Sequence, residues 1–166
     1  MKKQWLIILF IFLLSFNSIS QSKVAHIDTY ELIKSMPEMI QVEVDLKKWE
    51  EEKNNEFEDL RAAIKAKARE YNAIALELSN EENEENVKEI EVMENNVFDY
   101  MRQSQEEYQK KHDLLIQPII EKANNAIEAV GREKGFDYVI DSSKGQGLLL
   151  ADGTDIMADV KIYLGF

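Results

Sequence analysis

Two histidines are the residues in this sequence whose type first suggests chemistry. Histidine nitrogens bind metal ions when carboxylates or further histidines lie beside them. His26 falls in the predicted strand "KVAHID", 23–28, and His112 falls in a long predicted helix beside Lys110 and Lys111. We expect the two rings to lie far apart and to have structural or solvated roles, so we predict no metal site.

Three aspartates, Asp28, Asp137 and Asp141, flank the predicted strands and could meet at one end of the fold. Paired carboxylates can carry out acid–base catalysis. Aspartates at strand ends more often make turns or caps, which is the role we predict here. The glycines of "KGQGLLLADG" do not precede a helix at nucleotide-binding spacing, so we interpret them as turn residues. The sequence therefore predicts neither an enzyme nor a cofactor.

The N-terminal residues, 1–20, have the pattern of a cleavable signal peptide. Lys2 and Lys3 precede an apolar run from Trp5 to Leu14, and small residues follow at Ser18 and Ser20. We predict that this signal peptide directs export of the chain and is cleaved between Ser20 and Gln21. The alternative is an uncleaved anchor, but the apolar run is well short of the roughly 20 residues that span a bilayer.

Charge and cysteine content limit the classes of function. The chain has 32 acidic and 20 basic residues, and removal of Lys2 and Lys3 with the leader changes the net charge from −12 to −14. A surface of this sign repels phosphate, so we predict no nucleic-acid binding. The sequence has no Cys, so an exported chain must be held by packing or by oligomerisation.

The two ends of the mature chain predict a small β-containing base. The segment "KVAHID", 23–28, is expected to pair with "DYVID", 137–141, because a short strand is not stable alone. A further strand is predicted within "GQGLLLADG", 145–153, and a closing helix within "TDIMADVKIYL", 154–164, capped by Thr or Asp. This base, 21–36 and 131–166, is too small to bury a full core alone.

The middle of the chain, 37–130, predicts a long antiparallel helical hairpin, so the fold class is mainly α. The first helix begins at Pro37 and reaches about Leu78, with apolar residues at the seven-residue period of a coiled coil. The polar segment "SNEENEEN", 79–86, predicts a turn or weakly ordered tip, and the apolar pattern then resumes. The predicted seam consists of Phe57, Leu60, Ile64, Tyr71, Ile74, Leu78, Val87, Ile90, Val97, Met101, Tyr108 and Leu115.

Several other residues have predicted roles in assembly, binding or motion. The predicted core between chains consists of Val24, Ile27, Val139, Ile140, Leu148, Leu149 and Leu150. Phe98 and Tyr100 lie beside the seam, where they either complete the hairpin core or contact a binding partner. Pro118 removes one helical hydrogen bond, to the carbonyl of Leu114, and is either a static kink or a hinge.

The ordered combination of these segments resembles the Skp/OmpH family of periplasmic chaperones. The resemblance rests on "KVAHIDTYELIKSMPE", "LLIQPIIEKANNAIEAVGREKGFDYVID", "GLLLADG" and "DIMADVKIYLG". It implies a jellyfish-shaped homotrimer with a trimerisation body and three helical arms. It also implies a periplasmic, ATP-independent holdase that keeps unfolded outer-membrane β-barrel proteins in the cavity between the arms. The sequence after the signal peptide has no second apolar run of spanning length, so we predict no stable membrane insertion.

One departure from the family concerns charge. The best-known members have basic arms, whereas "WEEEKNNEFEDL" and "NEENEENVKEIEVMEN" are acidic. Lipopolysaccharide binding, which family proposals assign to clustered basic residues, therefore does not transfer to this chain. A second hypothesis is a structural coiled-coil spacer or adaptor of the envelope. A spacer should have a strict heptad seam, and Lys53, Lys67 and Glu94 interrupt this one, which favours the holdase.

Overall fold

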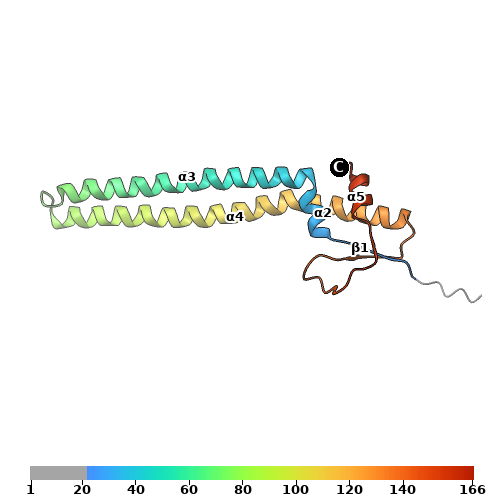
Figure 1. Ribbon diagram of the computed structural model, residues 1–166. Coiled ribbons are helices and arrows are strands. Elements are labelled where there is room, and N and C mark those ends of the chain that lie inside the picture. The colour runs from blue at the N-terminus through green and yellow to red at the C-terminus, as the bar shows by residue number, and fades with distance from the viewer. Residues whose placement is uncertain (1–21) are drawn as a thin grey trace, which may run out of the picture.

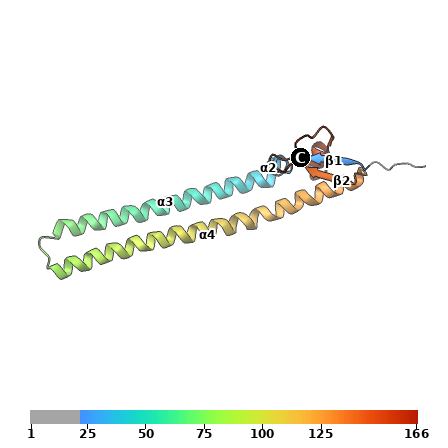
Figure 2. The same cartoon turned by 90° about the horizontal axis from the view of Figure 1, so that it is seen from below.

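The computed structural model describes residues 22–166, and the predicted signal peptide lies outside the described residues. Two long helices, α3 (Pro37–Ile74) and α4 (Asn80–Glu133), run side by side and form the arm (Figures 1 and 2). The other elements gather at one end of the arm as the base. They are β1 (Val24–Ile27), α2 (Thr29–Ser35), β2 (Tyr138–Asp141), β3 (Thr154–Asp155) and α5 (Met157–Leu164). The predicted fold class, mainly α with a small β base, is confirmed.

The sheet of the base has β1 in its centre, with β2 and β3 on either side and both parallel to it. Val24 pairs with Tyr138 along β2, and Ala25 pairs with Thr154 along β3. Parallel neighbours need a crossover connection, and the whole arm is the crossover between β1 and β2. The predicted pairing of 23–28 with 137–141 is therefore confirmed.

The predicted strand within 145–153 is wrong. Residues 142–153 form a loop, and the third strand is the two-residue β3 that follows it. Gly145 and Gly147 have φ angles of 92° and 87°, a left-handed conformation that interrupts an extended strand. The closing helix consequently starts at Met157, because Thr154 and Asp155 pair with β1. The Asp155 carboxylate still acts near the helix start, accepting a hydrogen bond of 2.8 Å from the Met157 N–H.

The start of α3 at Pro37 matches the sequence prediction. Met36, immediately before it, has an extended backbone with φ −68° and ψ 132°, since the proline ring disfavours helix in the preceding residue. This residue separates α3 from α2, a short helix that Asp28 caps by accepting a hydrogen bond from the Glu31 N–H.

The tip of the arm lies earlier in the chain than predicted. The turn covers 75–79, and the polar segment from Asn80 to Asn86 is the first part of α4 rather than a turn. Ser79 accepts a hydrogen bond from the Glu82 N–H at 3.2 Å, and the Glu82 carboxylate accepts one from the Ser79 N–H at 2.8 Å. This reciprocal capping box starts the helix within a segment that contains no apolar residue.

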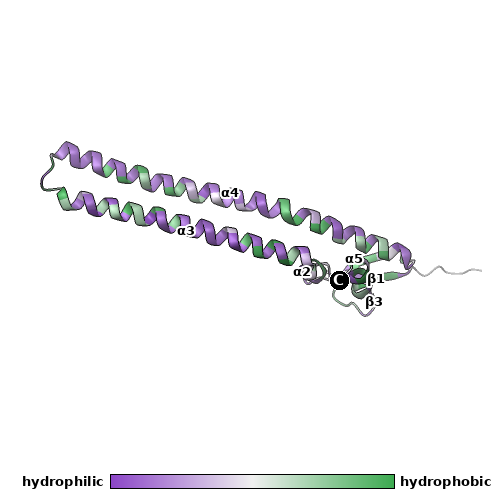
Figure 3. Ribbon diagram, turned by 90° about the horizontal axis from the view of Figure 1, so that it is seen from above, coloured by the Kyte–Doolittle hydropathy of each residue, from purple (hydrophilic) through white to green (hydrophobic). Residues whose placement is uncertain are grey.

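The hydrophobic core lies in the base and in the adjoining turns of the arm. Its buried residues are Ala25, Ile27, Leu32, Met36, Val42, Leu46, Ile119, Ala123, Ala126, Val130, Ile156 and Val160. Beyond these turns the arm is thin, and hydrophilic colouring dominates both of its helices in Figure 3.

The predicted seam residues differ in how far the hairpin covers them. Eight are half-buried: Phe57, Ile64, Tyr71, Leu78, Ile90, Val97, Tyr108 and Leu115. Four stay exposed in the single chain: Leu60, Ile74, Val87 and Met101. The lysines that interrupt the heptads also take part in the seam. Lys53 Nζ lies 5.4 Å from the centre of the Tyr100 ring, and Lys67 Nζ lies 4.7 Å from that of Tyr71.

Candidate functional site

Two of the three strand-flanking aspartates meet in the base. Ser143 Oγ lies 3.1 Å from Asp28 Oδ1 and 2.5 Å from Asp141 Oδ1, so a single buried serine joins both carboxylates. Asp137 lies at the other end of β2, where it accepts a hydrogen bond of 2.8 Å from the Lys23 N–H. The expectation that all three could meet is therefore wrong, because β2 separates Asp137 from Asp141.

The hydrogen bonds around Asp141 give this cluster a structural role. Thr29 Oγ1 donates to Asp141 Oδ2 at 2.6 Å, and the Ser143 N–H donates to Oδ1 at 2.9 Å. Burial alone would raise the pKa of Asp141, but the hydrogen bonds from Ser143 and Thr29 outweigh it and hold the pKa below its ordinary value. The cluster joins the end of β2 to the start of α2, which fits the predicted turn and cap roles.

The two histidines lie in separate parts of the fold. His26, on β1, has Nδ1 3.3 Å from Ser142 Oγ, whereas His112, in α4, has Nδ1 3.1 Å from Asp113 Oδ1. Among residues 22–166, no group of three or more His, Cys, Asp or Glu side chains could hold a metal ion.

Apolar side chains remain exposed on the base of the single chain. Val24, Tyr138 and Ile140 are exposed on neighbouring strands, and Leu149 and Leu150 are exposed in the loop that follows β2. Of the other residues predicted to pack between chains, Val139 and Leu148 are half-buried. Ile27 is 1% exposed and already belongs to the chain's own core, so it is not available to a neighbouring chain.

The two aromatic residues predicted to contact a binding partner have different environments. Phe98 is 71% exposed on α4. Tyr100 lies in the seam, where its hydroxyl donates to the Glu56 carboxylate of α3. The sequence placed the two residues together beside the seam, and the structure separates them. Only Phe98 presents most of its surface outward.

A groove runs along one side of the arm beside Phe98. It has a volume of about 780 Å³ and lies between Phe57–Ala68 of α3 and Ile90–Met101 of α4. Sequence reasoning missed Arg61 and Lys65, which line it from α3. Their spacing of four residues places them on one face of the helix and could have identified them.

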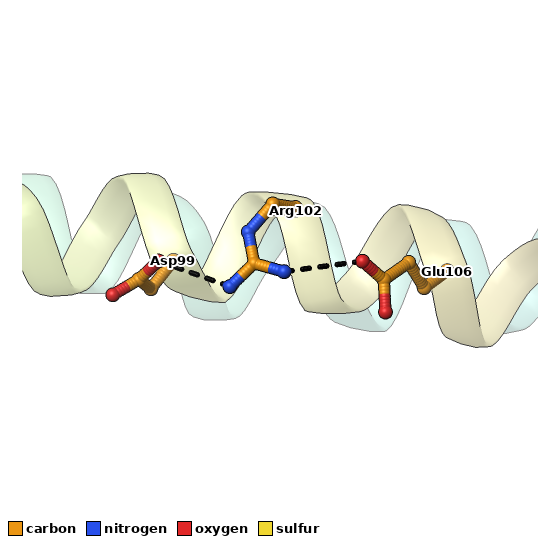
Figure 4. A network of polar contacts seen from close by, with 3 residues as sticks. All are labelled: Asp99, Arg102 and Glu106. Carbon is orange, nitrogen blue, oxygen red and sulfur yellow. Dashed lines mark hydrogen bonds and ion pairs between the residues drawn. The ribbon is translucent and has the colours of Figure 1, made fainter.

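Arg102 is a basic residue of the arm that neighbouring carboxylates neutralise. Its guanidinium lies between Asp99 and Glu106, with nitrogen–oxygen distances of 3.2 Å to each (Figure 4). All three residues lie on the surface of α4. A basic side chain held between two carboxylates offers little net attraction to an external phosphate.

Among residues 22–166, no helix is both long enough and apolar enough to cross a membrane.

Comparisons with known proteins agree with the fold. The family model described as "Outer membrane protein (OmpH-like)" matches residues 23–164. A crystal structure from Caulobacter crescentus CB15, described as that of a candidate outer membrane chaperone (OmpH-like), superposes with a TM-score of 0.77 at 17% identity. The match covers 87% of this chain and 85% of that one. No match was found among curated proteins.

Proposed function

We propose that this chain, which belongs to the OmpH-like family, is an ATP-independent holdase. A chaperone-type role follows from the family and from the shared fold. The finer proposal is that the chain binds unfolded outer-membrane β-barrel proteins in the periplasm and prevents their aggregation. Binding alone, without covalent chemistry, is sufficient for this role.

The observation that carries the proposal is the contrast between the arm and the base. Helices of 38 and 54 residues project from a base that contains three short strands and two short helices. Long, thin, mainly polar arms can surround a client without forming a permanent hydrophobic interface with it. Many weak contacts distributed along such arms would hold an unfolded chain and still release it.

We further propose that three copies assemble through their bases. Val24 and Ile140 expose 43% and 42% of their surface on adjacent strands, and Leu150 exposes 72% in the neighbouring loop. Several exposed apolar side chains on one part of the surface are typical of an interface. Assembly through the bases would leave the arms free to surround a cavity. Light scattering on the mature protein should give the mass of three chains, and a stable, folded monomer at micromolar concentration would refute this packing argument.

The test of the holdase proposal is an aggregation assay without nucleotide. A urea-unfolded outer-membrane β-barrel is diluted into buffer with the mature chain, and turbidity is followed over time. We expect suppression that saturates as the chaperone concentration rises. An acidic, folded protein of similar size serves as the control for non-specific charge effects. Equal turbidity with the chain and with the control would refute the proposal.

A further inference from the structure

The groove beside Phe98, the arm groove, extends almost to the tip of the arm. An adjoining hollow of about 370 Å³ shares Ala68, Ile90 and Glu94 with it and continues to Ala75. Together the two hollows extend from Phe57 of α3 to Ala75, the residue that follows the end of this helix. At about 1.5 Å per residue this is a length of roughly 27 Å, which accommodates about eight residues of extended chain.

The floor of the arm groove and part of its α4 edge are apolar. The half-buried residues Ile64, Ile90 and Val97 line it, and Phe98 and Met101 are 71% and 47% exposed at its α4 edge. A methionine beside an exposed aromatic ring can adapt to different side chains, which suits a site for variable sequences.

The two edges of the arm groove carry different charges. Arg61 and Lys65 line the α3 edge together with Glu58, which leaves one net positive charge there, whereas Glu94 lines the α4 edge. Arg61 is partly neutralised, since its guanidinium lies 3.5 Å from the Glu58 carboxylate and 5.5 Å from the Phe57 ring centre. Lys65 has no carboxylate within 4.0 Å among the described residues. An occupant with an apolar face and a polar face of mixed charge would complement both edges.

We propose that the arm groove binds extended segments of unfolded β-barrel clients in which apolar and polar residues alternate. Strands of membrane barrels alternate in this way and have about 9–11 residues, close to the length that the groove accommodates. Every second side chain would enter the apolar floor, and the others would face Lys65 and Glu94. The proposal rests on the holdase function and specifies where on the arm, and by which sequence pattern, clients are recognised.

The first test is a binding titration with a fluorescent ten-residue peptide that has apolar residues at alternate positions. Phe98→Ala should raise the dissociation constant by about five- to tenfold, because it removes an exposed aromatic contact. The matched control is Leu114→Ala, which truncates a residue of α4 that is 75% exposed and does not line the groove. Leu114→Ala should leave the dissociation constant within about twofold. Equal effects of the two substitutions would overturn the proposal.

A second test addresses the charged edge. Lys65→Glu should weaken the binding of a peptide whose polar face is acidic. It should leave the binding of a peptide with a neutral polar face unchanged. Lys110→Glu makes the same charge reversal on α4 away from the groove, so it controls for the net charge of the arm. If both charge reversals weaken the binding of the acidic peptide equally, general repulsion explains the result and the groove does not recognise charge.

A third test separates the pattern from the composition. A peptide of the same residues with its apolar side chains grouped together should bind about fivefold more weakly, because it cannot place alternate side chains on the floor.

Each variant is checked by circular dichroism and light scattering for an unchanged fold and assembly. If the wild-type chain protects whole clients but binds neither peptide, the arm groove proposal fails alone. If it does neither, the holdase proposal fails as well.

Discussion

Gly131 of α4 lies against Val139 of β2 so closely that a Cβ atom at position 131 would stand 2.8 Å from Val139 Cγ2. Both residues belong to the junction where the arm meets the sheet, and Gly131 is buried. The absence of a side chain at this position therefore sets how closely α4 can approach β2, and with it the direction of the arm relative to the base.

We predict that Gly131→Ala destabilises the fold although alanine is the better helix former. The helical preference contributes about 1 kcal/mol in favour of alanine, but overpacking against a stiff β-branched side chain costs about 1–3 kcal/mol. The measurement is the free energy of unfolding by urea at fixed protein concentration. Asn95→Ala, on an exposed helical position of α4, should be neutral or slightly stabilising. A double variant with Val139→Ala should remove the overlap, and a Gly131→Ala penalty that persists there would contradict this explanation.

The hydrogen-bonded Asp141 carboxylate predicts a specific loss of stability in acid. Its pKa in the folded chain lies below the ordinary value of 3.8, so the unfolded chain binds more protons near that pH. The contribution of Asp141 is therefore complete above about pH 3.8 and is lost as the pH falls through the lower folded value. Asp141→Asn should give a flatter curve of unfolding free energy against pH in this acidic range. Asp152→Asn, in the exposed loop, should follow the wild type, and a slope for Asp141→Asn equal to that of the wild type would contradict the assignment.

The capping box at the tip predicts a local effect of Ser79→Ala. Loss of the hydroxyl that accepts from the Glu82 N–H should destabilise the first turn of α4 by about 1 kcal/mol. Hydrogen exchange of the amides at 82 and 83 should become faster, and the base should be unaffected. Ser79→Asn restores an N-capping side chain and should return the rates towards the wild type. Unchanged exchange in Ser79→Ala would show that the cap does not determine where α4 starts.

Most of the architecture was predictable because the spacing of apolar residues indicates helix along both halves of the arm, and a few local signals set its boundaries. The start of α3 at Pro37 and the pairing of 23–28 with 137–141 follow from proline stereochemistry and from the isolation of two short apolar runs. The tip was misplaced because an absence of apolar residues was interpreted as a turn. The Ser79–Glu82 pair, spaced three residues apart, was the signal that a helix starts there.

The loop after β2 and the arm groove depend on tertiary geometry, which the spacing of apolar residues in the sequence does not specify. "GLLL" is apolar enough for a strand, but glycines with positive φ at 145 and 147 make it a loop. Phe98 and Tyr100 are two positions apart, and a difference of about 200° around the helix axis separates their environments. The seam spacing alone left their directions unassigned, so only the three-dimensional arrangement revealed the arm groove and the place of Arg61 and Lys65 in it.

Pro118 lies inside α4, next to the buried Ile119 at the root of the arm, and the helix continues through it. If it acts as a hinge, Pro118→Ala should stiffen the arm by restoring a hydrogen-bond donor to the Leu114 carbonyl. The capacity for large clients should then fall, while the capacity for small clients and the assembly of chains stay unchanged. Client capacity is measured by titration with unfolded barrels of increasing size. Equal capacity for every size would leave Pro118 as a static kink.

Sedimentation of a fluorescently labelled unfolded β-barrel with the mature chain, without nucleotide, tests the holdase function most directly. We predict a soluble complex in which the chaperone is present in multiples of three chains, and tryptophan fluorescence should show that the barrel stays unfolded. Transfer to lipid vesicles should then release the barrel in a form that folds. A labelled barrel that sediments as aggregate in the presence of excess chaperone, or that does not bind the chaperone, would contradict the holdase proposal.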